Sequence, residues 1–573
     1  MESIDALFLS YYEDLDRWHN DHLPEAERVP PRAAAGTADP DSSDYTYLGR
    51  IARQSVSLDG GRYDLGRFLS WVERGDTTRW RSYDSYTATH LSGSYFRSFL
   101  ARHGHDCRHV NQADRHVLGQ LAEQLEPRYV LLSTTFLIET ATLLEACRAV
   151  RRSFPGAKLV LGGLILVELQ KTLAPAAFQR LLSAWGADAY VVSAMGEEPL
   201  LAMLSAPPGV PLDELELPST WVRRGRTFGP ASARPERALP MDENYVRWSR
   251  FAPGSVHPTV NARTARSCAF KCSFCCYPVN QGPLTLMAPE TLRAELLELE
   301  RLGGVRALCF ADDTFNVPLR RFGELCRVLR DFDFTWYSFF RAQYADEDTA
   351  ALMAESGCQA VFLGLESVDD QVLRNMDKVA TRAKYERGIA ALKEAGIRCH
   401  ANFIVGFPGD RVEKAQAIVD FVDALEIEFF TVSPWYFSPG TPIAGRREKY
   451  GLEGAYWKWR HDTMSSEEAH DLEQSLLKAP RRSTFVSELS ANGFWSELML
   501  YAGGLSAAEV RAAVRLYNRL AGADHPAAER AADPEVRALR RILRERALPE
   551  PPPAASPRDR LEPRRAHAAG PSV

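Results

Sequence analysis

The stretch SCAFKCSFCCYP, residues 267–278, places four of the chain's ten cysteines in one short segment. Their spacing is Cys268-x3-Cys272-x2-Cys275, and Cys276 follows directly. The 573-residue chain is otherwise ordinary for a globular protein, with 45% hydrophobic and 25% charged residues. In a reducing compartment, clustered thiols bind metal more often than they bind one another. The segment therefore predicts a metal site.

Two kinds of metal site compete for this spacing. Three thiolates on one loop can bind three irons of a [4Fe–4S] cluster, which leaves the fourth iron open to a small molecule. A structural zinc site needs four ligands, commonly as two separated pairs. Cys276 is an awkward fourth ligand because adjacent side chains point apart, and no later C-x2-C or H-x3-H completes a zinc site. The spacing favours the iron–sulfur cluster, with structural zinc as the alternative.

The cysteine segment follows the first strand of an alternating series of strands and helices. The expected strands lie in TVNARTARS, RALCFADDTFN, FTWYSFFRAQY, AVFLGLES, CHANFIVGFPG and FFTVSPWYFSPG. About six such units predict a partial (β/α)6 barrel over residues 257–464. Residues 465–547 are expected to be helical. The Pro-, Ala- and Arg-rich end, 548–573, is expected to be disordered.

A first alternating series occupies residues 1–205. Buried strands are predicted at 5–12, 106–111, 129–137, 157–166 and 188–196, with helices between them. This rhythm predicts an α/β, doubly wound, Rossmann-like domain, with a long insertion at about 20–88 and a loop at 29–44. The Pro- and Arg-rich residues 206–256 are expected to be a linker. Ligands of such sheets bind at the carboxyl ends of the strands. These ends carry Ser133, Thr134, Thr135, Gly162, Gly163, Ser193 and Gly196.

The bulk composition excludes several classes of protein. A net charge of −6 and a pI near 6.2 give no basic excess, so nucleic acid is not an expected partner. No apolar run reaches the ~18 residues of a membrane span. The N-terminus, MESIDALFLSYYEDLDRWHND, lacks the features of a secretory signal, so we expect a cytoplasmic protein. A monomer is expected. The six cysteines outside the cluster are expected to be small buried side chains. They are Cys107, Cys147, Cys309, Cys326, Cys358 and Cys399.

The cysteine spacing, with Phe274 before the last cysteine and a partial barrel around it, resembles the radical S-adenosylmethionine (SAM) enzymes. The resemblance implies a [4Fe–4S] cluster on Cys268, Cys272 and Cys275. It also implies that SAM chelates the open iron. Cys276 is then not a ligand.

Later strands supply candidate SAM contacts under this resemblance. Asp312 and Asp313 stand where the family often has Gly-Gly-Glu, so this chain departs from the pattern, and the pair could equally form a turn or a helix cap. Glu366, in GLES, matches the fourth-strand motif. Arg341, in SFFRAQY, is expected to face SAM or a carboxylate. Gly406, in IVGFPG, matches the fifth-strand motif beside adenine, although its glycines could be simple turn residues.

The first domain adds a second resemblance. LARHGHDCRHVN, LLSTTF, FPGAKLVLGG and GADAYVVSAMGEEPLL, placed before such a barrel, resemble the cobalamin-binding radical SAM enzymes. The resemblance assigns the seven strand-end residues named above to the surroundings of cobalamin. Small residues let the backbone approach a large flat ring. The Asp-x-His-x-x-Gly motif of cobalamin domains is missing, because Asp16 and His19 have the wrong spacing. We therefore expect no histidine ligand to cobalt.

The segment WKWRHDTMSSEEA, residues 457–469, carries a finer resemblance. Its Trp-x-His-x-Thr-Met run is similar to the phosphinate P-methyltransferases and related natural-product C-methyltransferases. Trp459, His461, Thr463 and Met464 would then reach the substrate end of the barrel. A capped helix start at SSEEA beside a packed tryptophan explains the segment equally well.

Together these resemblances imply a cobalamin-dependent radical SAM methyltransferase. It would transfer methyl from methylcobalamin to an unactivated carbon, or to a phosphinate phosphorus, of a secondary-metabolite intermediate, through a 5′-deoxyadenosyl radical. Flavodoxin or ferredoxin would supply the electron. The alternatives are other cobalamin-domain radical SAM reactions, namely cyclisation, ring contraction or carboxypropyl transfer. A non-enzymatic cobalamin-binding regulator is a further alternative.

Overall fold

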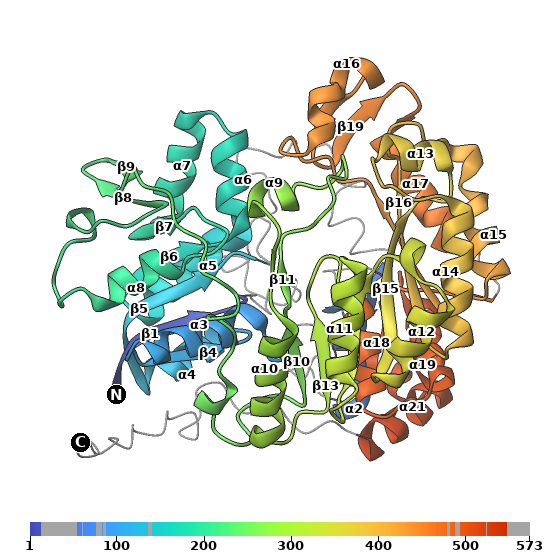
Figure 1. The fold of residues 1–573 in the computed structure, drawn as a ribbon, viewed down its shortest axis with the longest axis horizontal. Coiled ribbons are helices and arrows are strands. Elements are labelled where there is room, and N and C mark those ends of the chain that lie inside the picture. Colours follow the sequence, from blue (N-terminus) through green and yellow to red (C-terminus); the bar gives the residue numbers. More distant parts are fainter. Residues whose placement is uncertain are drawn as a thin grey trace.

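The computed structural model describes residues 1–12, 54–59, 61–75, 83, 88–135, 140–477, 479, 482–487, 493–522 and 524–546. Two predominantly parallel sheets with flanking helices lie side by side, and a group of C-terminal helices packs beside the second sheet (Figure 1). The predicted loop 29–44, the predicted tail 548–573, Asp16 and His19 lie outside the described residues. No helix in the described part combines the length and the apolar character needed to cross a membrane.

The first sheet has the order β4-β1-β5-β6-β7-β8-β9. Its strands are β1 (Glu2–Leu9), β4 (Cys107–Val110), β5 (Leu125–Ser133), β6 (Lys158–Gly162), β7 (Ala189–Val191), β8 (Thr220–Arg224) and β9 (Thr227–Pro230). The five strands β4, β1, β5, β6 and β7 run parallel, which confirms the Rossmann-like prediction. The winding direction reverses between β1 and β5. Doubly wound sheets open a ligand crevice at such a switch point.

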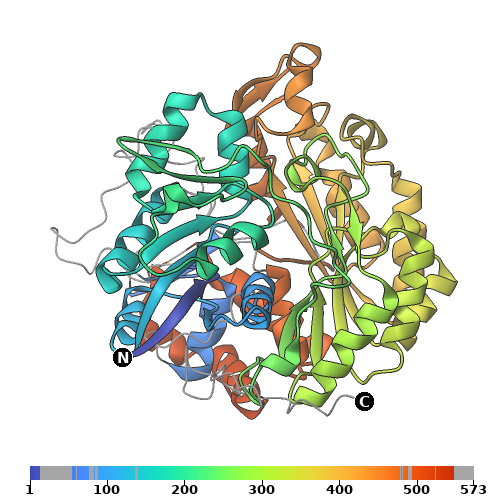
Figure 2. The ribbon, with the colours of Figure 1, turned by 60° about the vertical axis from the view of Figure 1, so that its left-hand side comes forward.

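Alternating side chains divide this sheet between two cores. One face packs against α3 (Leu91–Arg102) and α8 (Glu197–Ser205). The other face packs against α4 (Arg115–Ala122), α5 (Thr140–Ser153) and α7 (Pro175–Trp185). Figure 2 shows this sheet on the left with its helices, and the second sheet beside it on the right.

Several predictions in this domain were wrong in extent: the strand predicted at 129–137 is Leu125–Ser133, and the one predicted at 188–196 is only Ala189–Val191. The strand predicted over 157–166 ends at Gly162, because Gly163 takes φ 137° and α6 (Leu164–Thr172) begins directly after it. The predicted linker 206–256 contributes β8 and β9, which extend the sheet in antiparallel fashion around a turn at Gly225, where φ is 63°. The arginines of WVRRGRTF hid this hairpin from a composition-based prediction.

The second sheet has the order β10-β13-β14-β15-β16-β17-β21. Its strands are β10 (Thr259–Ala262), β13 (Ala307–Phe310), β14 (Thr335–Phe340), β15 (Cys358–Glu366), β16 (Arg398–Val405), β17 (Phe429–Pro434) and the short β21 (Thr484–Phe485). All pair in parallel, so the predicted six-unit partial barrel is confirmed, with β21 added at its end. The outer helices are α10 (Pro289–Leu302), α11 (Leu319–Leu329), α12 (Glu347–Glu355), α14 (Arg382–Glu394) and α15 (Gln416–Ala424).

The C-terminal region is helical, as predicted. Its main helices are α17 (Ser466–Leu477), α18 (Gly493–Ala502), α19 (Ala507–Leu520) and α21 (Pro534–Glu545). An unpredicted helix from the first domain's insertion, α2 (Leu65–Arg74), joins this core. Arg540 Nε donates to the Val72 carbonyl at 2.6 Å, and β22 (Asp524–His525) pairs with β2 (Val56–Leu58).

Candidate functional site

The cysteine segment is a loop held at both of its ends. β11 (Ala265–Arg266) pairs antiparallel with β12 (Thr285–Leu286), so the two ends of the loop 267–284 lie next to each other. The middle of the loop is fixed by Ser273, whose backbone N–H donates to the Met376 carbonyl at 2.8 Å and whose hydroxyl donates to the Asn375 carbonyl at 2.8 Å. The thiols therefore sit on a rigid loop at the carboxyl end of the barrel strands.

The three predicted ligands lie in different surroundings on this loop. Cys272 is buried, Cys268 and Cys275 are half-buried, and Cys268 Sγ lies 3.4 Å from Thr314 Oγ1. Burial raises the pKa of Cys275 to about 12, so its thiolate needs a nearby positive charge such as bound iron. Among the described residues, no three His, Cys, Asp or Glu side chains converge on a point suited to one metal ion. A [4Fe–4S] cluster offers each thiolate a separate iron, so it does not require such convergence.

Arg341 faces one of these thiols. Its Nη2 donates to Cys272 Sγ at 3.2 Å, its Nη1 donates to the Lys378 carbonyl at 3.1 Å, and its guanidinium lies 3.5 Å from the Phe270 ring centroid. Asn316 exchanges two hydrogen bonds with the Arg341 backbone. The side chain expected to bind SAM is thus fixed against a cysteine sulfur.

Glu366 closes β15 in a strained backbone conformation, with φ 67°. Lys378 Nζ donates to its Oε1 at 2.8 Å, and both side chains are buried. A Cβ at Gly364 would lie 2.8 Å from the same oxygen, so glycine leaves room for this pair. Non-glycine residues at positive φ cluster at functional sites. Lys378 pairs with Oε1 only, so Oε2 of Glu366 can still contact a cationic group of a ligand.

The two aspartates after β13 have separate surroundings. Asp312 accepts from the backbone N–H and the hydroxyl of Thr264, at 3.0–3.1 Å and 2.9 Å, which fixes the turn before the cysteine loop. Asp313 lines a cavity described below and pairs with Tyr277. Burial raises the pKa of Asp313 to about 7. Asp312 thus has the turn role weighed in the sequence analysis, while Asp313 is available to a ligand.

The GFPG turn after β16 is held from outside by a small antiparallel sheet. Its strands are β18 (Glu453–Ala455), β19 (Lys458–His461) and β20 (Met464–Ser465). His461 Nε2 donates to the Gly406 carbonyl at 2.9 Å, and Gly409 N–H donates to Thr463 Oγ1 at 3.1 Å. A Cβ at Gly406, where φ is 86°, would lie 2.5 Å from the Trp459 ring. Met464 is buried in the adjoining core.

The Trp-x-His-x-Thr-Met run therefore contacts the turn expected beside adenine. Burial lowers the pKa of His461, so its ring is neutral near pH 7. This fits a ring that donates through Nε2 and accepts the Thr463 hydroxyl at Nδ1, 3.1 Å away. The placement of this run at the substrate end stays a prediction.

A cavity of about 320 Å³ opens between the two sheets. Six of the seven residues predicted around cobalamin line it: Ser133, Thr135, Gly162, Gly163, Ser193 and Gly196. The seventh, Thr134, is buried beside it and donates through its hydroxyl to the Gly162 carbonyl at 3.1 Å. The opposite wall comes from the barrel and includes Asn261, Ala311 and Asp313. The cavity thus joins the switch point of the first sheet to the strand end beside the cysteine loop.

Comparison with known families agrees with this geometry. The family model of the radical SAM superfamily matches residues 263–422, which contain the cysteine loop and the strands through β16. Residues 263–422 form a radical SAM domain. An uncharacterized methyltransferase of Pyrococcus horikoshii is 29% identical over 185 residues, 31% of this chain and 40% of that protein. The bacteriochlorophyllide d C-12(1)-methyltransferase of Chlorobaculum tepidum is 30% identical over 186 residues, 31% of this chain and 40% of that protein. The chain thus spans about two fifths of the length of these relatives.

Likeness to solved structures extends beyond the radical SAM domain. The radical SAM methyltransferase TsrM from Kitasatospora setae, solved with cobalamin and a [4Fe–4S] cluster bound, gives a TM-score of 0.56 over 76% of this chain and 96% of that chain. Its sequence identity is 16%, so the likeness concerns the fold. In this chain the Rossmann-like sheet precedes the radical SAM domain, as predicted.

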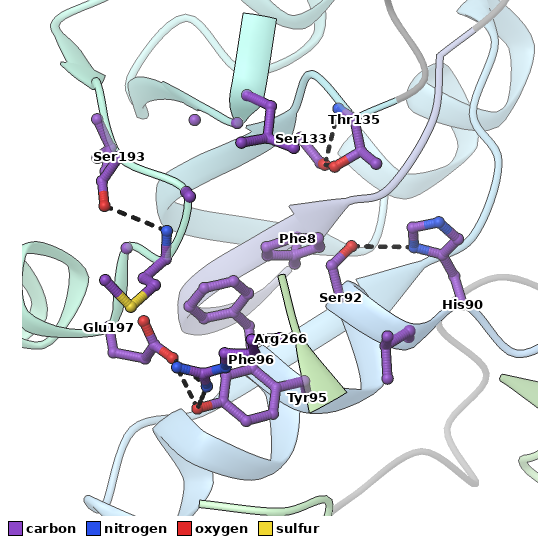
Figure 3. A pocket seen from close by; sticks show the side chains of 18 of the residues that line it. Phe8, His90, Ser92, Tyr95, Phe96, Ser133, Thr135, Ser193, Glu197 and Arg266 are labelled. Atoms are coloured by element: carbon purple, nitrogen blue, oxygen red, sulfur yellow. Dashed lines mark hydrogen bonds and ion pairs between the residues drawn. The ribbon is translucent and has the colours of Figure 1, made fainter. Parts of the chain in front are cut away.

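The cavity wall combines small strand-end residues with aromatic side chains. Gly163 has φ 137°, and a Cβ there would lie 2.4 Å from Thr134 Oγ1. Phe8 and Phe96 stack with ring centroids 5.4 Å apart and form an apolar floor (Figure 3). Small residues above a flat apolar surface leave a slot in which backbone and hydroxyl groups can contact a ring edge.

Several cavity residues were missed by the sequence analysis. They are Phe8, His90, Tyr95, Phe96, Glu197, Arg263, Arg266, Tyr277 and Trp495. Some of them carried a local signal: Glu197 follows Gly196, Arg266 stands two residues before Cys268, and Tyr277 follows Cys276. Tyr95, Phe96 and Trp495 come from helices, which carry no such signal.

Cys276, predicted not to be a ligand, faces the first domain. Its thiol donates to Glu168 Oε2 at 3.5 Å, and Ser438 donates to the other oxygen of the same carboxylate. Burial, followed by the Glu168 charge, raises the pKa of Cys276 to about 12. Lys171, on the same helix as Glu168, donates to Asn280 Oδ1 at 3.0 Å. α6 therefore holds the cysteine loop from the side of the first domain.

Proposed function

We propose that this protein is a cobalamin-dependent radical SAM methyltransferase acting on a small molecule. The observation that supports this most directly is the cavity shared by the strand ends of the first sheet and the strand ends of the radical SAM domain. When bound, the cluster with SAM supplies a hydrogen-abstracting radical, and the corrin supplies a methyl group. A methyl donor and a radical source are therefore expected at opposite walls of one cavity.

The chain's own residues have separate tasks in this proposal. Cys268, Cys272 and Cys275 would bind three irons. Glu366, already paired with Lys378, and the backbone of Gly406 would contact SAM. The strand-end residues of β5, β6 and β7 would surround the corrin. The largely apolar wall limits the access of water to reactive groups.

The acceptor is proposed to be an unactivated carbon, or a phosphinate phosphorus, of a secondary-metabolite intermediate. Flavodoxin or ferredoxin is the proposed electron donor. Cyclisation, ring contraction or carboxypropyl transfer would use the same cofactors and differ only in product.

The test is anaerobic reconstitution of the full chain with iron, sulfide and hydroxocobalamin, followed by removal of excess ligand. We expect iron and one cobalt per chain, a brown iron–sulfur spectrum, and reductant-dependent formation of 5′-deoxyadenosine from SAM. Iron without cobalt would leave radical chemistry but contradict the methyl-transfer proposal. Zinc in place of iron after reconstitution would contradict both.

A further inference from the structure

Two arginines reach the cavity from the segment just before the cysteine loop. Arg263 follows β10 and Arg266 ends β11, and both line the cavity. Arg263 is half-buried, and its guanidinium lies 5.4 Å from the Tyr95 ring centroid. Within the described part of the chain, no hydrogen bond or ion pair joins its guanidinium to another residue.

Only part of the hydrogen-bonding capacity of the Arg266 guanidinium is used. Its Nη2 donates to Glu197 Oε1 at 2.8 Å and to the Tyr95 hydroxyl at 3.1 Å (Figure 3). Its side chain is 5% exposed, yet Nε and Nη1 have no partner. Glu197 Oε2 also has none. The cluster therefore offers unused donors and one unused acceptor beside the cavity.

The carboxylates in this corner leave guanidinium N–H groups without acceptors. Glu197 accepts from Arg266 through Oε1 only. Asp312 accepts from Thr264 and Asp313 pairs with Tyr277, so among the described residues neither carboxylate hydrogen-bonds Arg263 or Arg266. Burial, followed by repulsion from Arg266, lowers the pKa of Arg263. A buried guanidinium N–H without an acceptor is destabilising unless a ligand supplies the missing oxygen.

We propose that Arg263 and Arg266 bind an anionic oxygen group, a phosphate, phosphinate or carboxylate, of the ligand that fills the cavity. A planar guanidinium binds such groups through paired N–H···O bonds. Glu197 Oε2 would accept one N–H or O–H of the same ligand. The identity of that ligand rests on the proposed function, and two sources share this chemistry: the nucleotide phosphate of cobalamin and an acidic group of the substrate.

The test compares wild type with Arg263→Gln and Arg263→Lys in the full chain. Three probes are used in equilibrium dialysis: hydroxocobalamin, cobinamide (which lacks the nucleotide phosphate) and radiolabelled inorganic phosphate. Inorganic phosphate is measured with and without bound corrin. Arg320→Gln is the matched control because Arg320 lies on α11 with its side chain 94% exposed. Circular dichroism and iron content after reconstitution verify folding.

Each outcome either supports or contradicts the proposed anion-binding site. If cobalamin supplies the anion, Arg263→Gln weakens cobalamin about tenfold or more and leaves cobinamide unchanged, with partial recovery in Arg263→Lys. If the substrate supplies it, both corrins bind equally to the two proteins, while inorganic phosphate binds the corrin-loaded wild type but not Arg263→Gln. Equal binding of all three probes by wild type and Arg263→Gln overturns the proposal. If the wild-type protein does not retain cobalamin, the proposed function is contradicted instead. The binding of inorganic phosphate without corrin then still tests the role of the two arginines.

Discussion

Arg341 Nη2 lies 3.2 Å from Cys272 Sγ, in a buried position where two other contacts fix the guanidinium. Hydrogen bonds to ligand sulfurs stabilise the more negative, reduced form of an iron–sulfur cluster and so raise its reduction potential. The first prediction is that Arg341→Gln shifts the cluster potential to a more negative value. Potentiometric EPR titration of the reconstituted protein measures this.

Two further variants distinguish an effect on the reduction potential of the cluster from a loss of structure. Arg341→Lys keeps the charge and one donor and is expected to shift less. Lys271→Gln changes an exposed cation on the same loop and is expected to leave the potential unchanged. An unchanged potential in Arg341→Gln, at full iron content, would show that the contact does not tune the cluster.

The second prediction separates Cys276 from its neighbours. Cys275→Ala is expected to lose most of its iron after reconstitution, because a ligand is removed. Cys276→Ala is expected to keep the wild-type iron content, since its thiol contacts Glu168 rather than the other thiols. Iron and sulfide assays decide this. Equal iron loss in the two variants would mean that Cys276 also binds the cluster.

The third prediction concerns Gly163. Alanine there would meet Thr134 Oγ1 at 2.4 Å in a backbone conformation that L-residues disfavour. We expect Gly163→Ala to weaken cobalamin binding about tenfold, since a loss of 1.4 kcal/mol suffices. Gly156→Ala is the control because no atom lies within 4 Å of the added Cβ. Absorption of retained corrin after gel filtration measures the effect, and equal retention by both variants would argue against corrin near Gly163.

The fourth prediction tests whether the Trp-x-His-x-Thr-Met run holds the GFPG turn in place. His461→Ala removes the donor to the Gly406 carbonyl, so the GFPG turn loosens. We expect about tenfold weaker SAM binding, as for one lost buried hydrogen bond. Asp462→Ala, at the exposed residue next to it, is the control. If SAM binds normally to His461→Ala while product formation falls, the run acts on the substrate, as the sequence resemblance implied.

The fifth prediction concerns pH. Burial raises the pKa of Glu295 to about 8, and its Oε1 accepts the Trp248 indole N–H at 3.1 Å. In the unfolded chain the Glu295 carboxyl loses its proton near pH 4.5. The contribution of protonated Glu295 to the free energy of unfolding is therefore complete below that pH and is lost as pH rises toward 8. Glu295→Gln stays neutral, and its melting temperature should fall less between pH 5.5 and 8.5 than that of wild type. Glu300→Gln, an exposed change on the same helix, should follow wild type.

Local pattern was sufficient for much of this fold. The strand–helix rhythm predicted both parallel sheets, and the cysteine spacing predicted the radical SAM domain, because each signal lies within one segment. The helix α2 was missed since its buried face is covered by α19 and α21, which come more than four hundred residues later. Tertiary packing of that kind leaves no local signature.

The residues of the candidate site were likewise predictable only where the signal is local in sequence. Strand-end residues such as Gly163 were predictable because parallel strands bring their ends to one edge. The partner of Arg341 was not, since Cys272 lies 69 residues away in the chain. Arg263 and Tyr95 were missed because a cavity wall between two domains follows no sequence period.

The pairing of β2 with β22 and of α2 with α21 has a consequence for how the protein is made. The carbonyl of Val72 meets Arg540 across 468 positions of sequence. On a ribosome adding roughly 5–20 residues per second, α2 waits roughly 20–90 s for its covering helices. During that interval Phe68, Leu69 and Val72, all buried in the finished fold, face solvent or a chaperone. The nascent chain thus exposes this apolar face until its last helices emerge, and a chain ending before residue 534 would lack α21, one of the helices that cover it.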